Sequence, residues 1–230
     1  MAINITSATK CLATDAHGVS AFHRCKTAKE VKALALCDFD ERALDRKGLT
    51  PLHYACRDGN LEVALALIAV NPEVLCDTTP IGDTPLHVLC GRGWSEMVGP
   101  IVKHGADVNA KGRAGWTPLH FASQQAQIKT ARSLVEHGAD VNAETSTGVT
   151  PLHVASSHGH FGLVRELIAL GADKNAETST GRTPQMICKT HDLKMLFATE
   201  APKPTEPSKP DFSALVTALK AVVAELEKLK

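Results

Sequence analysis

A repeat of about 33 residues runs through most of this 230-residue chain and limits the folds that it can adopt. The tetrapeptide Thr-Pro-Leu-His occurs four times at steps of 33 or 34 residues, and weaker copies precede and follow it. A glycine stands two residues before the first residue of every copy. The copies begin at Ser20, Thr50, Thr84, Thr117, Thr150 and Thr183. A fixed period of this length is typical of stacked modules, so it predicts a linear array in place of one closed core.

Each repeat predicts two helices. Proline at the first helical position loses no hydrogen bond, and the threonine before it can cap the helix. Small side chains recur five residues after the threonine, with Leu89 as the exception. Glycines separate the two helices and end the second one, where the left-handed conformation suits them: Gly59, Gly93, Gly159, Gly105, Gly138 and Gly171. The fourth unit has Ala126 in place of the separating glycine, so we expect a different corner there.

This pattern resembles the ankyrin repeat, whose period is about 33 residues and whose signature contains Thr-Pro-Leu-His-x-Ala. The resemblance implies an all-α solenoid of about six helix-turn-helix units with hairpin-like turns, spanning residues 14–199. We expect the units to start near residues 15, 45, 79, 112, 145 and 178, after a lead-in at 1–13. The first and last units depart from the pattern, as the end units of a stack do.

The last 31 residues, 200–230, have a different pattern. Prolines at 202, 204, 207 and 210 predict an extended linker over 200–210. From 211 to 230 apolar residues are three and four apart, as in a coiled coil: Phe212, Leu215, Leu219, Val222, Leu226 and Leu229. A short isolated helix is marginal in water, so this stripe needs a partner. We expect homo-oligomerisation, with docking on another protein or folding back on the stack as the alternatives.

The residues with catalytic or metal-binding chemistry fit structural roles. The sequence has no phosphate loop, nucleophile elbow, HExxH or dinucleotide motif. Histidines recur once per unit, about 10 Å apart, which is too far to share an ion: His53, His87, His120 and His153. We expect them to hydrogen-bond neighbouring turns. Seven cysteines without a CxxC pair predict neither a disulfide framework nor a zinc site. The small inner-helix positions predict buried thiols at Cys25, Cys56, Cys90 and Cys188. We therefore expect no cofactor, no metal and no enzymatic activity.

Charge and hydropathy limit the classes of partner and the cellular location that we expect. The 25 basic and 25 acidic residues cancel, which speaks against nonspecific binding to nucleic acid or to an anionic membrane. The longest apolar-rich run, residues 61–70, is too short to cross a bilayer, and no secretory signal is evident. We expect a cytoplasmic protein, with the nucleus as the alternative location.

The resemblance implies a protein partner on the concave face made by turn tips and inner helices. The expected function is that of a non-catalytic scaffold or adaptor; the alternative is an inhibitor, assembly chaperone or regulatory subunit of an enzyme complex. Trp116 beside Arg113 is the sharpest candidate, because tryptophan and arginine are enriched in binding hot spots. Trp94, Tyr54 and Phe121 are predicted to pack within the framework. The candidate contact residues are Arg46, Lys47, Leu49, Arg57, Asp58, Ile81, Asp83, Arg92, Arg113, Trp116, Gln124, Gln125, Val149 and His158.

One modification is also implied by the resemblance. Asn142 follows Leu134, Asp140 and Val141 at the spacing that ankyrin-directed asparaginyl hydroxylases favour, and Asn109 is a near match. Hydroxylation at these two positions is an expectation that depends on the presence of such an enzyme.

Overall fold

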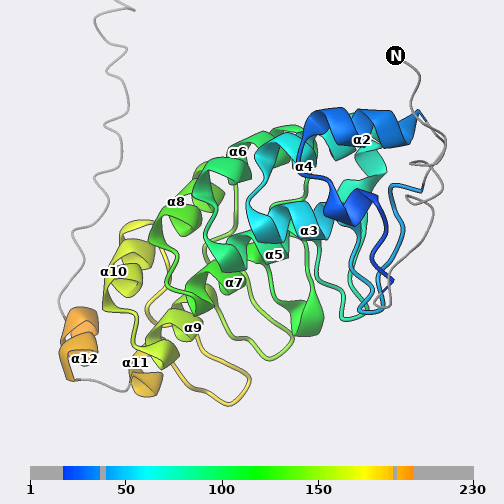
Figure 1. Cartoon of the computed structure of the whole chain (residues 1–230). Coiled ribbons are helices and arrows are strands. Elements are labelled where there is room, and N and C mark those ends of the chain that lie inside the picture. Colours follow the sequence, from blue (N-terminus) through cyan, green and yellow to red (C-terminus); the bar gives the residue numbers. More distant parts are fainter. Residues whose placement is uncertain (1–17, 37–39, 189–190, 199–230) are drawn as a thin grey trace, which may run out of the picture. The chain divides into compact units, whose positions relative to one another are not determined.

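The computed structural model describes residues 18–36, 40–188 and 191–198 (Figure 1). In these ranges the chain is helical, without a strand, and the helices come in successive pairs. The pairs are η1 Phe22–Arg24 with α2 Ala28–Ala35, α3 Pro51–Asp58 with α4 Leu61–Val70, α5 Pro85–Arg92 with α6 Ser95–Lys103, α7 Pro118–Gln124 with α8 Ile128–Glu136, α9 Pro151–His158 with α10 Phe161–Ala169, and α11 Pro184–Ile187 with α12 His191–Ala198. Two further 3-10 turns are η2 Pro72–Cys76 and η3 Arg113–Gly115. The predicted all-α solenoid of about six units is confirmed.

The predicted lead-in at 1–13, the linker at 200–210 and the helix at 211–230 lie outside the described residues. The oligomerisation residues on that helix, Phe212 to Leu229, lie outside them as well.

The helices form two rows (Figure 1). The inner helices α3, α5, α7 and α9 follow one another in one row, each packed on the next, and α4, α6, α8 and α10 form the second row. The turns between units extend from the side of the inner row. Every inner helix therefore presents one face to its neighbours and leaves another open beside the turn tips.

The leucine of the repeated tetrapeptide is buried in each unit: Leu52, Leu86, Leu119 and Leu152. Burying such a side chain contributes about 1.5–3 kcal/mol. Buried residues of the outer helices, such as Leu67, Ile101, Leu134 and Leu167, continue the same core along the stack. Aliphatic side chains thus build the core that the repeat predicts.

The repeated histidines join each unit to the next. In α7 the backbone N–H of Thr117 donates to Nδ1 of His120 at 3.1 Å, and Nε2–H of His120 donates to the carbonyl oxygen of Val149 at 2.9 Å. The same bridge recurs at 2.8 to 3.1 Å along the stack, from His23 to Leu49, His53 to Asp83, His87 to Trp116 and His153 to Arg182. The prediction that these histidines hydrogen-bond neighbouring turns is confirmed.

Glycine conformation explains the breaks between helices. Gly59, Gly93 and Gly159 end inner helices with φ of 73°, 84° and 77°. Ala126 occupies the equivalent position and takes φ 55°, so the corner keeps the left-handed conformation although alanine stands there. The corner differs in where the helix ends, because α7 ends at Gln124 and its C-cap Gln125 has φ −102°. The left-handed residue is kept, and its strain falls on the alanine.

None of the helices in the described part of the chain is both long and apolar enough to span a bilayer.

Candidate functional site

The turn tips are rigid because a backbone hydrogen bond closes each of them and a histidine of the preceding unit binds the same carbonyl oxygen. The backbone N–H five residues before the threonine donates to the carbonyl oxygen just before it, for example from Asp45 to Leu49 at 3.0 Å and from Gly112 to Trp116 at 2.7 Å. That same carbonyl oxygen accepts the histidine of the preceding unit. The residue before each threonine is therefore fixed in space, and it is a position at which the sequence predicted partner contacts.

Most of the predicted contact residues are accessible. Exposed members are Arg46, Lys47, Asp58, Ile81, Arg92, Arg113, Gln125 and His158, and half-buried members are Leu49, Arg57, Trp116, Gln124 and Val149. Asp83 is a correction, because only 5% of it is exposed. Its Oδ1 accepts the backbone N–H of Arg113 at 3.1 Å. Asp83 therefore supports the next turn and does not project toward a partner.

Arg113, Trp116 and Phe121 form a cluster on the fourth unit, which we call the aromatic cluster. The Arg113 guanidinium carbon is 4.8 Å from the ring centroid of Phe121 and 5.6 Å from that of Trp116. The two rings meet edge to face at 5.6 Å, and His87 touches Phe121 from the preceding unit at 5.2 Å. These contacts hold the three side chains in one arrangement before any partner arrives.

The backbone of this turn is special. Ala114 has φ 51°, which distinguishes η3 from the other tips. The carbonyl oxygen of Ala114 accepts both the backbone N–H and the hydroxyl of Ser146, each at 3.0 Å. The fifth unit thus fixes the turn that carries Arg113.

Tyr54 lies at the same register on α3 as Phe121 on α7. Its hydroxyl donates to Asp45 Oδ2 at 2.9 Å, and the Arg57 guanidinium carbon lies 4.1 Å from its ring centroid. Tyr54 and Phe121 are both half-buried, so they pack on their neighbours as predicted but also reach the open face. The sequence reasoning missed this second role. The sequence signal was their position four residues after the threonine. Their direct neighbours in the chain, a histidine before and an alanine after, are buried, and adjacent residues of a helix point in different directions.

Trp94 has the predicted framework role. Its Nε1–H donates to the carbonyl oxygen of Arg57 at 3.3 Å. A Cβ atom on Gly59 would lie 2.6 Å from its indole ring, so the ring covers the end of α3.

Burial favours the neutral form of the four histidines in the Thr-Pro-Leu-His copies. Burial lowers the pKa of His53, His87 and His153, and it lowers that of His120 to about 4. Within the described ranges no group of three or more His, Cys, Asp or Glu is placed to hold a metal ion. These imidazoles therefore act as hydrogen-bonding groups at each tip.

Three of the four cysteines predicted to be buried are buried: Cys56, Cys90 and Cys188. Burial raises the pKa of the Cys56, Cys90 and Cys188 thiols. Cys25 is only half-buried, which corrects the prediction.

Asn109 and Asn142 link successive units with their amides. Oδ1 of Asn109 accepts the backbone N–H of Asp140 at 2.8 Å, and Oδ1 of Asn142 accepts that of Asp173 at 2.7 Å.

Comparison with known proteins agrees with this geometry. Residues 5–111 and 70–145 match a family model described as ankyrin repeats in three copies, and residues 134–184 match one described as ankyrin repeats in many copies. Among curated proteins, the chain is 33% identical over 98 residues to the nuclear factor NF-kappa-B p105 subunit of Gallus gallus, covering 41% of this chain and 10% of the relative. It is 35% identical over 108 residues to the SMC5-SMC6 complex localization factor protein 1 of Homo sapiens, covering 43% and 10%.

A third relative is the "Probable 26S proteasome regulatory subunit p28" of Saccharomyces cerevisiae, 39% identical over 69 residues, or 29% of this chain and 30% of the relative. The chain thus matches less than a third of the length of each of these relatives. The repeat period, the histidine bridges and the family models agree, and the chain belongs to the ankyrin repeat family.

Proposed function

We propose that this protein is a non-catalytic scaffold or adaptor that captures a partner protein on the open face of its inner helices and turn tips. Ankyrin repeats are protein–protein interaction modules, and the relatives are regulatory or scaffold-like proteins. The observation that carries the proposal is the aromatic cluster of Arg113, Trp116 and Phe121, which is held in place by its own contacts.

The cluster has the properties of a binding hot spot. Tryptophan and arginine lead hot-spot composition, and truncation of such a residue commonly costs about 2 kcal/mol or more. Preorganised side chains lose little further freedom on binding, so more of the contact energy remains as affinity.

The test compares the double variant Trp116→Ala, Arg113→Ala with the wild-type chain. The full chain, immobilised, is used to capture partners from an extract of its source cells, and the captured proteins are identified by mass spectrometry. A loss of about 2 kcal/mol lowers affinity roughly 30-fold, so the principal partner should disappear from the variant.

A matched control removes an aromatic and an arginine from the outer row. Phe161 and Arg165 are exposed on α10, so Phe161→Ala, Arg165→Ala should leave capture unchanged. Capture of the same partner in equal amount by the Trp116→Ala, Arg113→Ala variant, with unchanged circular dichroism, would contradict the proposed face.

A second candidate function is that of a regulatory subunit, inhibitor or assembly chaperone of an enzyme complex. The similarity to the yeast proteasome regulatory subunit over 69 residues favours it. The identity of the captured protein separates the two: an ATPase or protease subunit supports the second candidate, and a non-enzymatic partner supports the scaffold.

We also propose that residues 211–230 self-associate through Phe212, Leu215, Leu219, Val222, Leu226 and Leu229, whose spacing favours a coiled coil. Joining several stacks in this way would raise the effective concentration of binding faces. Sedimentation of the full chain beside a truncation after Thr199 tests this, and equal monomer masses would reject it. A cytoplasmic location, with the nucleus as alternative, is part of the same proposal and is checked by imaging a tagged chain.

A further inference from the structure

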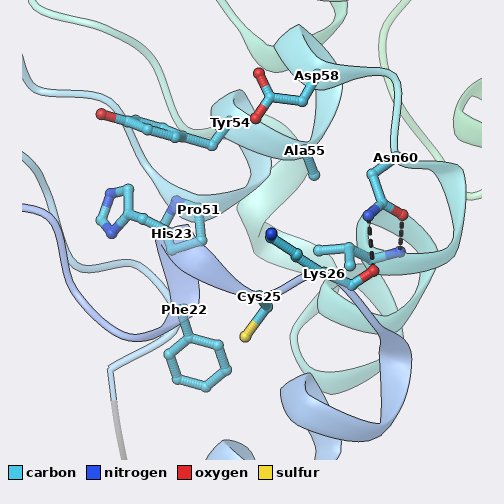
Figure 2. Close-up of a pocket in the computed structure, with 10 residues that line it drawn as sticks. Phe22, His23, Cys25, Lys26, Pro51, Tyr54, Ala55, Asp58 and Asn60 are labelled. Atoms are coloured by element: carbon cyan, nitrogen blue, oxygen red, sulfur yellow. Dashed lines mark hydrogen bonds between the residues drawn. The ribbon is translucent and has the colours of Figure 1, made fainter. Parts of the chain in front are cut away.

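A pocket of about 230 Å³ opens between the first two units, at one end of the binding face (Figure 2). Its lining includes Phe22, Cys25, Lys26, Tyr54, Ala55 and Asp58. Tyr54 and Asp58, four residues apart on α3, are half-buried and exposed, so the pocket opens beside the accessible side of this inner helix.

The pocket has a clear origin in the sequence. The inner element of the first unit, η1, is a single turn of three residues, whereas α3 has eight. At Cys25 the backbone becomes extended, with φ −59° and ψ 134°, and leaves the inner row. The second half of α3 therefore lacks the neighbour that the other inner helices have, and the pocket lies where a second helical turn would pack.

The size and floor of the pocket favour one apolar side chain. Phe22, Ala55 and Val63 are buried and line it. Pockets for cofactors and drug-sized ligands span about 300–1,000 Å³, so this one is too small for such a ligand. On the far side, Asn60 donates to the carbonyl oxygen of Lys26 at 2.9 Å and accepts the N–H of Val63 at 3.0 Å, which fixes that wall (Figure 2).

Lys26 is the cation at the mouth of the pocket, and its backbone N–H donates to the carboxylate of Glu30 at 2.7 Å. Lys26 is exposed, and its side chain points inward in Figure 2, between the side that carries Asn60 and the side that carries Pro51. The one carboxylate among the lining residues, Asp58, is bound by Arg57 at 2.7 and 3.1 Å.

The neighbouring turn adds positive charge. Arg46 and Lys47 are exposed there, whereas the carboxylate of Asp45 is buried and accepts the N–H groups of Lys47 and Leu49, each at 2.8 Å. Among the described residues, neither Arg46 nor Lys47 is joined to a carboxylate in an ion pair. The carboxylates of Asp45 and Asp58 are thus engaged within the protein, whereas Arg46 and Lys47 remain for a partner.

We propose that the pocket takes one aliphatic or aromatic side chain from an extended acidic segment of the partner protein, whose carboxylates face Lys26, Arg46 and Lys47. This inference rests on the proposed function and specifies the chemistry of its partner. The aromatic cluster lies two units farther along, about 20 Å at roughly 10 Å per unit. About six extended residues cover that distance, so one segment can engage both places.

An acidic peptide fits this surface better than a nucleic acid does. The buried apolar floor offers a phosphate nothing to bind, and the chain as a whole carries no net charge. A nucleic acid is recognised first by dense positive charge.

The experiment selects peptides from a random 16-residue display library on the full chain and measures the binding of the selected peptides by fluorescence anisotropy. We expect selected sequences to be rich in Asp and Glu around one apolar residue. Lys26→Glu should weaken their binding at least tenfold. Lys29→Glu is the matched control, because Lys29 is exposed on α2 and does not line the pocket, and it should change binding less than twofold.

A second variant, Ala55→Leu, fills the pocket and should also weaken binding at least tenfold; circular dichroism and thermal melting check its fold. If Ala55→Leu has a lower melting temperature than the wild type, the comparison of Lys26→Glu with Lys29→Glu alone tests the inference. Equal binding by the Lys26→Glu and Lys29→Glu variants overturns the inference, and so do selected peptides without acidic residues. Binding of poly(U) RNA that Lys26→Glu abolishes, without peptide binding, overturns it too.

The outcomes also separate this inference from the proposed function. Peptides that depend on Trp116 and Arg113 but not on Lys26 would leave the binding face intact and remove the pocket from it. Natural partner capture that survives Trp116→Ala, Arg113→Ala would instead remove the face itself.

Discussion

Acid should loosen the stack through its bridging histidines, and His120 offers the sharpest case. Its imidazole is fully buried, with Nδ1 accepting the N–H of Thr117 and Nε2–H donating to Val149. Burial, partly offset by the bond to Val149, lowers its pKa from 6.5 to about 4, and the nearby His87 and His153 contribute to the lowering. A proton on Nδ1 would also remove the acceptor that caps α7.

The direction in which stability changes with pH follows from the linkage between proton binding and folding. A folded-state pKa below the unfolded value means that the unfolded chain binds the proton more readily, so stability is complete above about pH 6.5 and falls as the pH drops toward 4. A pKa difference of about 2.5 units corresponds to at most about 3.4 kcal/mol. At pH 5 the loss from His120 alone amounts to about 2 kcal/mol. His53, His87 and His153 act in the same direction.

The assay is urea unfolding followed by circular dichroism at pH 7 and pH 5, for the wild type and for His120→Gln. Glutamine does not titrate, so the difference in unfolding free energy between the two proteins should shrink by about 2 kcal/mol from pH 7 to pH 5. A difference that stays constant between the two pH values would refute the reasoning.

Two further substitutions test the fold. Ala126→Gly should raise the free energy of unfolding by about 1 kcal/mol, because Ala126 takes φ 55° and alanine is strained in the left-handed region; a lower melting temperature of this variant would contradict it. Ser123→Ala should leave stability unchanged or raise it by up to about 1 kcal/mol, because the buried Ser123 hydroxyl has no hydrogen-bond partner and the corresponding positions carry Cys56 and Cys90; a clear loss in urea unfolding would show that this hydroxyl is satisfied after all.

Much of the fold could be predicted because the repeat encodes it locally. The period placed the helix starts directly after the threonines, at Pro51, Pro85, Pro118 and Pro151. One histidine per unit, too far from the next to share an ion, indicated hydrogen bonds to neighbouring turns. These features depend on short stretches of sequence and on contacts that every unit repeats.

The site was harder to predict because it depends on differences between units. Asp83 has the register of a contact residue, yet it is buried because Gly112 lets the next turn approach: a Cβ atom there would lie 2.6 Å from Asp83 Oδ1. How far Tyr54 and Phe121 reach the surface depends on what the neighbouring unit places beside them. The pocket arises from the short η1, which the weak first copy of the repeat did not reveal.

The histidine bridges also give the array a direction. The histidine of each unit binds the turn that follows it. The series of these hydrogen bonds begins at His23 and ends at the carbonyl oxygen of Arg182. In the last described unit Met186 stands where the histidine would be, and 69% of it is exposed. An engineered seventh unit would therefore require Met186→His to bind its turn. One residue thus determines where the series of histidine bridges ends.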